Sequence, residues 1–293
     1  MVDWLLVDGS SLIFRAFYGV PGSVRSPDGR PVNAVHGFLG RLAGLLKERR
    51  PARLAVAADE DWRPAWRVEL IPSYKAHRTA EPVPPELQPQ LPVIEELLEA
   101  IGVDVAGWPE AEAEDVIATW VARALEASPE VRIEVVSGDR DLFALVRDPE
   151  VRVLYLSRNG PIVVDEAEIT HRYGVPGRSY ADLAVLRGDP SDGLPGLRGV
   201  GAREAAELLR RYGSLEGVLA SGRLSEAERE YVTRARRVVM PLADLPLSLP
   251  GGRRERYPVD PDRVERLSRE HGVGGPVARL LRALSRMGDP NPS

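Results

Sequence analysis

The sequence contains no cysteine, so disulfide bonds, zinc–thiolate sites and thiol nucleophiles are excluded. It also has no run of about 18 apolar residues, the length that a membrane-spanning helix needs. Residues 1–4 lack a basic segment followed by an apolar stretch, so we predict no signal peptide. These features are compatible with a reducing cytosol, and 293 residues with 43% hydrophobic side chains suffice for one large or two smaller domains.

Lysine is almost absent too. Only two of the 39 basic side chains are lysines, Lys47 and Lys75. We therefore expect position 75 to need a compact ammonium group, with chance as the alternative, since Lys47 has no evident role. The net charge of −5 argues on its face against binding to nucleic acid, but it is a sum, and clustered carboxylates would conceal basic surface elsewhere.

Carboxylates, in contrast, are concentrated. Glu110, Glu112, Glu114 and Asp115 lie within six residues, directly before an apolar helical stretch. Acids at the start of a helix complement its dipole, and taken alone that explanation is as good as a functional one. In a regular helix Glu112 and Asp115 would share a face, and Glu114 would point elsewhere. Further acids follow predicted strands or lie in a turn rich in glycine and proline: Asp8, Asp59, Asp139, Asp141, Asp189 and Asp192.

The segments before these acids are predicted to form a parallel sheet. Apolar runs predict strands at 4–8, 54–58, 131–136 and 151–156, with a short one at 103–106. Helical patterns cover 12–17, capped by Ser10 or Ser11, 32–47, 93–101, 116–125, and the chain from about residue 166 to its end. Strand–helix–strand units pair in parallel, so Asp8, Asp59 and Asp139 would meet at the carboxyl edge of one sheet. Converging carboxylates without Cys or His are ligands for Mg²⁺ or Mn²⁺.

Residues 62–78 interleave aromatic and basic side chains, and closely spaced prolines follow up to Pro92. Because the prolines prevent a regular helix until about residue 93, we predict that residues 74–92 leave the sheet as a mobile excursion. Alternating aromatic and basic side chains suit a single strand of nucleic acid, whose bases stack and whose phosphates pair. An ordinary exposed loop would have the same composition.

Residues 187–201 are rich in glycine and lead into a helix predicted at 202–211. Glycines before a helix let backbone N–H groups approach a phosphate. A P-loop is excluded because no strand precedes the segment and the Gly-Lys-Ser/Thr ending is missing. The pattern favours a helix–hairpin–helix element that grips a DNA backbone, and a plain packing corner between two helices is the alternative.

Taken together and in order, these motifs resemble the bacterial 5′-nuclease family, which includes flap endonucleases and the N-terminal nuclease domain of DNA polymerase I. The matching stretches are Leu6-Val7-Asp8-Gly9-Ser10, Tyr74-Lys75-Ala76-His77-Arg78, Glu112-Ala113-Glu114-Asp115-Val116, Gly138-Asp139-Arg140-Asp141-Leu142, and Gly188-Asp189-Pro190-Ser191-Asp192 with Gly196 to Gly201. The resemblance implies an α/β fold: a PIN-like nuclease core with a parallel sheet and flanking helices at 1–165, including a mobile arch at about 74–100. It also implies a helical region at 166–293, with a helix-three-turn-helix element at about 180–221 and C-terminal helices.

The resemblance also implies two divalent cations, Mg²⁺ or Mn²⁺. One site would use Asp8, Asp59, Glu112, Glu114, Asp115 and Asp139, and the other Asp139, Asp141, Asp189 and Asp192. Tyr74, Lys75 and Arg78 would lie near the scissile phosphate. DNA would be held at Gly196, Arg198, Gly199, Gly201 and Arg203, where the glycine hairpin would also bind K⁺. Three features depart from the family pattern: Glu114 replaces the usual Asp, Gly193 replaces the usual Asn, and the segment from Asp59 to Tyr74 is one residue longer.

The predicted function is therefore that of a structure-specific, metal-dependent 5′ nuclease of DNA replication and repair. It would act as a flap endonuclease and 5′-3′ exonuclease, as a monomer in the bacterial cytoplasm near the nucleoid, without a membrane. It would bind 5′-flap or nicked and gapped duplex DNA and leave a 5′-phosphate and a 3′-hydroxyl. A PIN-type ribonuclease, a non-catalytic structure-specific DNA-binding protein and an N-terminal fragment of a DNA polymerase I are the alternatives.

Overall fold

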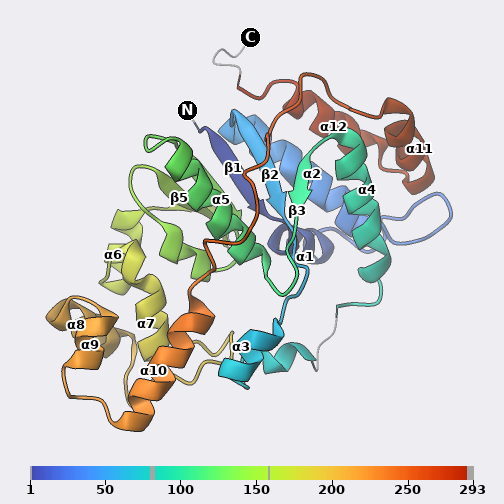
Figure 1. Cartoon of the computed structure of the whole chain (residues 1–293). Coiled ribbons are helices and arrows are strands. Elements are labelled where there is room, and N and C mark those ends of the chain that lie inside the picture. The colour runs from blue at the N-terminus through green and yellow to red at the C-terminus, as the bar shows by residue number, and fades with distance from the viewer. Residues whose placement is uncertain (1, 80–82, 158, 289–293) are drawn as a thin grey trace.

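The computed structural model describes residues 2–79, 83–157 and 159–288. Its centre is a sheet in the order β3-β2-β1-β4-β5-β6, in which β1 to β5 run parallel and β6 pairs antiparallel with β5. The strands are β1 (Trp4–Asp8), β2 (Arg53–Ala57), β3 (Asp104–Ala106), β4 (Ile133–Ser137), β5 (Val151–Ser157) and β6 (Gly160–Val164). The parallel central strands (Figure 1) confirm the predicted α/β fold.

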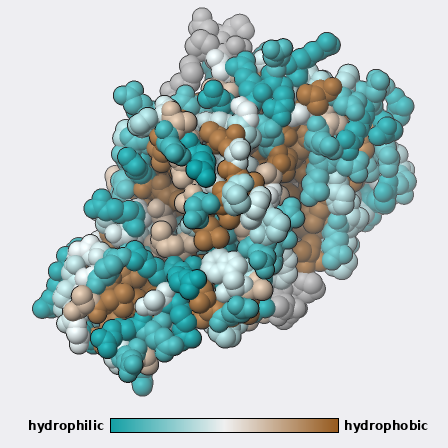
Figure 2. All heavy atoms as spheres, viewed as in Figure 1, coloured by the Kyte–Doolittle hydropathy of each residue, from teal (hydrophilic) through white to brown (hydrophobic). Residues whose placement is uncertain are grey.

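Helices flank the sheet and extend beyond one end of it (Figure 1). They are α1 (Gly9–Gly19), α2 (Asn33–Arg49), α3 (Ala65–Leu70), α4 (Leu91–Ile101), α5 (Ala113–Ala127), α6 (Glu166–Tyr173), α7 (Tyr180–Arg187), α8 (Ala202–Tyr212), α9 (Leu215–Ala220), α10 (Glu226–Val239), α11 (Pro261–His271) and α12 (Gly274–Leu284). In the described part of the chain, no helix is long and apolar enough to cross a membrane. Hydrophilic residues cover most of the face in Figure 2, and hydrophobic ones show between them in separate patches.

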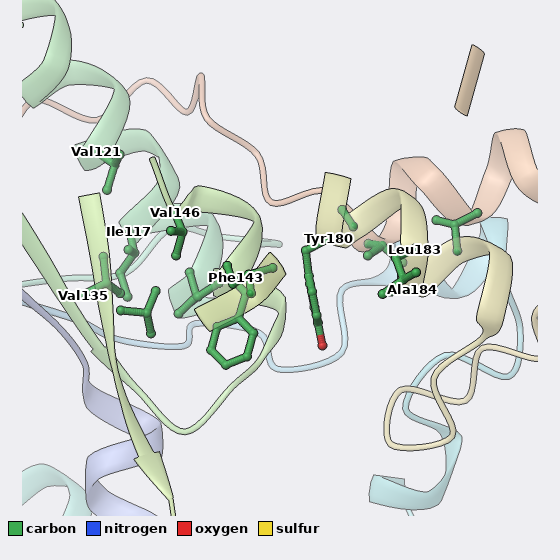
Figure 3. Packing of buried hydrophobic residues seen from close by; sticks show 14 of the residues in the cluster. Ile117, Val121, Val135, Phe143, Val146, Tyr180, Leu183 and Ala184 are labelled. Atoms are coloured by element: carbon green, nitrogen blue, oxygen red, sulfur yellow. The ribbon is translucent and has the colours of Figure 1, made fainter. Parts of the chain in front are cut away.

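The strands are buried on both faces because alternate side chains enter two different cores. Leu5 and Val7 pack with α1, α2, α4 and the C-terminal helices. Leu6 packs on the opposite face with α5 and the helices that follow residue 166. Figure 3 shows this second core, where Tyr180, the first residue of α7, lies beside Phe143 with ring centroids 5.3 Å apart. The second core therefore fixes the helical region against the carboxyl half of the sheet.

Two segments differ from the sequence-based expectation. The chain is not helical throughout its last third, because residues 241–260 form an extended connection between α10 and α11. Prolines interrupt this segment, and it runs back along α5 and the sheet (Figure 1), where the Leu54 amide donates to the Gly252 carbonyl at 2.8 Å. The edge strand β6 was not predicted, because its alternate residues are partly exposed and Pro161 lies within it, as an edge position tolerates.

The turn from β1 into α1 is tight, because the helix begins directly after the strand. Asp8 caps α1 by accepting a hydrogen bond from the Ser11 amide at 3.0 Å, so the expected cap at Ser10 or Ser11 is wrong. Gly9 is the first residue of the helix and lies against β2. A Cβ atom at Gly9 would lie 2.7 Å from the Ala57 carbonyl oxygen and 3.0 Å from Val56 Cγ1.

We expect Gly9→Ala to destabilise the protein by roughly 1–3 kcal/mol, because the added methyl group forces β1 and α1 away from β2. The matched control is Gly44→Ala on α2, where an added Cβ meets nothing within 4 Å. That change should stabilise the protein by up to about 1 kcal/mol through helix propensity. Urea unfolding of both variants measures the difference, and equal effects would contradict the close approach at Gly9.

Candidate active site

The carboxyl edge of the sheet opens into a cavity of about 510 Å³. Five of the predicted metal ligands line it: Asp8 from β1, Asp59 after β2, Asp139 after β4, and Glu112 and Glu114 at the start of α5. Lys75 lines the same cavity. The structure therefore brings together acidic side chains from four separate parts of the chain, at the edge where the sequence placed them.

Asp8 is fixed at the tip of β1 by its hydrogen bonds. Besides the Ser11 amide, its carboxylate accepts from the hydroxyls of Ser11 at 2.6 Å and Ser137 at 2.5 Å. The side chain is 6% exposed, and burial together with the charge of Asp59 raises the pKa of Asp8 to about 6. The surroundings of Asp8 thus position the carboxylate without supplying enough positive charge to stabilise its anion fully.

The start of α5 presents Glu112 and Glu114 to the cavity together. Glu112 is the N-cap with extended backbone, and Asp115 accepts its backbone N–H at 3.0 Å in a capping-box arrangement. Because Glu112 is not yet helical, the geometry of a regular helix, in which Glu114 would point elsewhere, does not apply at this start. Asp59 accepts the Ala113 amide at 2.6 Å, which ties the end of β2 to the same helix start.

Two buried cations face this acidic cluster. Arg67 of α3 contacts Glu112, Glu114 and Asp115, and Lys75 forms an ion pair with Glu112. The side chain of Arg67 is fully buried and that of Lys75 is 2% exposed. Burial and the neighbouring Glu112 nevertheless raise the pKa of Glu114 well above its usual range. The negative charge of the cluster therefore exceeds what these two side chains balance.

The second predicted ligand group adjoins the first through Asp139. Its carboxylate accepts the Asp141 amide at 3.0 Å. Burial, Asp139 and Asp192 raise the pKa of Asp141 well above its usual range, as expected of closely placed carboxylates. Asp189 lies in a turn closed by backbone hydrogen bonds with Leu194 at 2.9 and 3.0 Å. Its carboxylate is 3.4 Å from guanidinium nitrogens of both Arg140 and Arg187.

The base of the predicted arch is packed against the protein. Tyr74 is 1% exposed and donates to Glu112 at 2.5 Å, and the Lys75 amide donates to the Asp192 carbonyl at 2.9 Å. The reading of these two residues as part of an exposed loop is therefore wrong. Residues 80–82 and the side chain of Arg78 lie outside what the structure describes. The mobility of the arch stays a prediction.

Gly193 makes the contact between the arch base and the Asp189–Asp192 turn possible. A Cβ atom there would lie 2.0 Å from the Ser73 carbonyl oxygen, and Gly193 has a φ of 71°. The Ser73 hydroxyl in turn donates to the Gly193 carbonyl at 2.6 Å. This close packing gives a physical reason for glycine at a position where the sequence departs from the pattern it resembles.

The glycine-rich turn between α7 and α8 divides into an inner and an outer part. Gly196 is inner: a Cβ there would lie 2.5 Å from the Arg187 backbone, and its amide donates to Tyr231 of α10 at 2.9 Å. Gly199 and Gly201 are outer, with no atom within 4 Å of an added Cβ. Arg198 and Arg203 are also exposed on the outer part, which leaves two cations at the start of α8 on the surface.

Sequence reasoning missed several residues of the site. Arg67 was read as part of a basic–aromatic stretch for nucleic acid, whereas it is an internal counter-ion. Phe14 and Tyr18 on α1 line the cavity with 38% and 73% of their surfaces exposed, and Trp62 also lines it. The helical spacing of Phe14 and Tyr18 beside Asp8 was the signal that could have placed them there.

The donor set suits a hard divalent cation. All its side-chain donors are carboxylate oxygens, and burial raises the pKa values of several of them, which a cation in the cavity would reverse. Within residues 2–79, 83–157 and 159–288, no three acidic or histidine side chains are already arranged as a complete ligand set.

Comparison with known proteins agrees with this geometry. A family model for the 5′-3′ exonuclease N-terminal resolvase-like domain matches residues 3–174, and one for the 5′-3′ exonuclease C-terminal SAM fold matches residues 175–246. The chain belongs to the 5′-3′ exonuclease family. The nuclease is therefore an enzyme that hydrolyses phosphodiester bonds, in a family that depends on divalent metals. The resemblance drawn from the sequence is confirmed.

Two relatives match this nuclease along nearly their whole length. It is 47% identical to a 5′-3′ exonuclease of Streptomyces coelicolor, with 96% of this chain and 100% of the relative covered. It is 46% identical to a 5′-3′ exonuclease of Mycobacterium tuberculosis, with 97% and 98% covered. Its fold is similar to that of the bacteriophage T5 D15 flap endonuclease in complex with DNA and metal ions, with a TM-score of 0.68, 17% identity, and 97% and 99% covered.

We expect Asp8→Asn to stabilise the metal-free nuclease at neutral pH. The folded pKa of Asp8 is raised from 3.8 to about 6, so its contribution to stability is full below 3.8 and is lost as the pH rises through about 6. The loss amounts to roughly 3 kcal/mol. Asparagine keeps an oxygen that accepts the Ser11 amide but carries no charge.

The measurement is Tm in the presence of a chelator at about pH 5 and about pH 7.5. The gain from Asp8→Asn should be larger at the higher pH. Asp262→Asn, at an exposed position in the first turn of α11, is the control and should give no such difference. An Asp8→Asn profile parallel to that of the unaltered protein would contradict the raised pKa.

Proposed function

We propose that this nuclease cuts DNA at the junction of a 5′ flap with a duplex and also removes nucleotides from a 5′ end, acting as a monomer. The observation that carries the proposal is the single cavity lined by Asp8, Asp59, Glu112, Glu114 and Asp139 together with Lys75. A phosphodiester drawn into that cavity would meet metal-binding carboxylates and a cation in one place.

The surroundings of the cavity support a substrate with both single-stranded and duplex parts. The exposed rings of Phe14 and Tyr18 at the cavity offer stacking surfaces for unpaired bases. The outer glycine-rich turn, with Arg198 and Arg203 exposed beside the start of α8, offers cations and backbone groups for duplex phosphates. K⁺ bound by backbone oxygens of this turn would add to the positive charge there.

The residues that would hold two divalent cations, either Mg²⁺ or Mn²⁺, fall into two adjoining groups. Asp8, Asp59, Glu112 and Glu114 would serve one and Asp141, Asp189 and Asp192 the other, with Asp139 between them. When bound, such cations lower the pKa of a water molecule and stabilise the leaving oxygen of an in-line displacement at phosphorus.

The chain's own side chains supply the rest of the chemistry. The Lys75 ammonium lies in the cavity and would stabilise charge on the phosphoryl oxygens once it exchanges Glu112 for the phosphate. The Asp192 carbonyl holds the Lys75 backbone at 2.9 Å, so the ammonium can move while its anchor stays in place. Arg78 is proposed to assist from the arch.

We expect Asp139→Asn to reduce cleavage of a labelled 5′-flap duplex by at least about a hundredfold at saturating metal, because Asp139 joins the two carboxylate groups. Duplex binding should persist. The assay uses Mg²⁺ and Mn²⁺ in separate reactions, with a chelator control and with the exposed Asp262→Asn as the control variant.

Undiminished cleavage by Asp139→Asn would refute the assignment. Cutting of single-stranded RNA alone would favour the PIN-type ribonuclease, and tight flap binding without cutting would favour a non-catalytic DNA-binding protein.

We expect Arg203→Ala to weaken binding to duplex DNA of any sequence and to reduce the slope of log K against log salt by about one. Arg269→Ala on α11 is a matched control, since both arginines are exposed and pair with a glutamate four residues away. Fluorescence anisotropy at several salt concentrations measures both. Equal slopes for the two variants would place the duplex elsewhere.

A further inference from the structure

Arg67 is a fully buried cation, and each of its three guanidinium nitrogens contacts an acceptor. Nη1 contacts Glu112, Nη2 lies 2.7 Å from Asp115 and 3.3 Å from Glu114, and Nε donates to the Val238 carbonyl at 3.1 Å. Burial alone would lower the pKa of Arg67, but the neighbouring acids, Glu114 foremost, keep it above its ordinary value. The side chain is therefore a permanent positive charge inside the protein, with no surface left for substrate.

Asp115 is held by three hydrogen bonds, as many as Asp8 and Glu112 accept, but unlike those two acids it does not line the cavity. One carboxylate oxygen accepts from Arg67 and from the Leu242 amide, both at 2.7 Å, and the other accepts the Glu112 amide at 3.0 Å. Its side chain is fully buried, and among the described residues it is not part of the cavity lining. Its complete burial and its position outside the cavity lining therefore separate it from the acids that a metal ion in the cavity would meet.

These contacts join the active site to the end of α10. Val238 lies in the last turn of α10, and Leu242 lies just after it. One turn after Asp115, Thr119 extends the same connection, since its hydroxyl donates to the Leu242 carbonyl at 3.1 Å and accepts the Leu245 amide at 3.3 Å. The segment that leaves α10 is thus fastened to one side of α5.

We propose that Arg67 and Asp115 form a permanent internal ion pair that positions Glu112 and Glu114 and locks α10 to α5, and that Asp115 is part of this support and not a metal ligand. The proposal deepens the proposed function, on which it rests, and departs from the ligand set implied by the sequence resemblance. Arg67 is a positioning residue, because it reaches the reaction only through the acids that it holds.

The first test compares Asp115→Asn with Glu114→Gln. In the metal-free protein, neutralising Asp115 leaves Arg67 with one charged partner fewer and should lower Tm, by roughly 10 °C. Neutralising Glu114 also removes a partner of Arg67, at the longer distance of 3.3 Å, but it relieves repulsion from Glu112, so Tm should fall less than with Asp115→Asn. In calorimetric titration with Mn²⁺, Asp115→Asn should lose clearly less affinity than Glu114→Gln, because Glu114 lines the cavity and Asp115 does not.

Equal losses of Mn²⁺ affinity in the two variants, or a higher Tm for Asp115→Asn in chelator, would overturn the proposal. If the unaltered protein did not bind Mn²⁺, that result would contradict the proposed function alone. The ion pair would still be tested, because the Tm comparison is made in chelator.

The second test is a double-mutant cycle in chelator. Arg67→Met leaves the Asp115 charge buried without its partner, so adding Asp115→Asn to that variant should restore part of the lost Tm. In the unaltered background the same Asp115 substitution should lower Tm. Effects that simply add would refute the pairing. If Arg67→Met fails to fold, Arg67→Gln replaces it in the cycle, since glutamine also removes the charge but keeps hydrogen-bond donors.

Discussion

The arrangement of the elements around the cavity depends on one electrostatic constraint. Several carboxylates must lie together in a cavity at the carboxyl edge of the sheet. Neighbouring carboxylates repel one another, and burial disfavours their charged forms. Both effects raise the pKa values of Asp8, Glu114 and Asp141. The protein offsets the strain with serine hydroxyls around Asp8 and with buried cations beside Glu112. These partners come from α1, α3, the base of the arch and the end of β4, so the acidic edge sets how those parts of the chain meet.

The same constraint explains how the helical region is attached. The Lys75 backbone lies against the Asp192 carbonyl, and a side chain at Gly193 would prevent that approach. Arg67 reaches the Val238 carbonyl at the end of α10. The two sets of predicted metal ligands are thereby connected, through the arch base on one side and through α10 on the other. Changes in the helical region can act on the acids through these contacts.

The sequence predicts the parts of the fold and site that depend on local patterns, and it does not predict those that depend on contacts between distant residues. Buried parallel strands appear as apolar runs, and Asp8, Asp59 and Asp139 follow such runs, so their shared edge could be predicted. Arg67 could not be recognised as an internal charge, because its partner Glu112 lies 45 residues further along the chain. The extended segment 241–260 was missed for the same reason, since its stabilising contacts are with α5 and β2.

The two buried cations, Arg67 and Lys75, suggest a physical reason why a chain with so little lysine has one at position 75. Arg67 donates through a rigid fork to several partners at once, which suits a charge that stays in place. Lys75 pairs with Glu112 through one ammonium on a flexible stem, which can exchange a carboxylate for a phosphate without disturbing the anchored backbone. An arginine at position 75 would be harder to release from the acids. We therefore infer that a chain with only two lysines keeps one here because this charge must move.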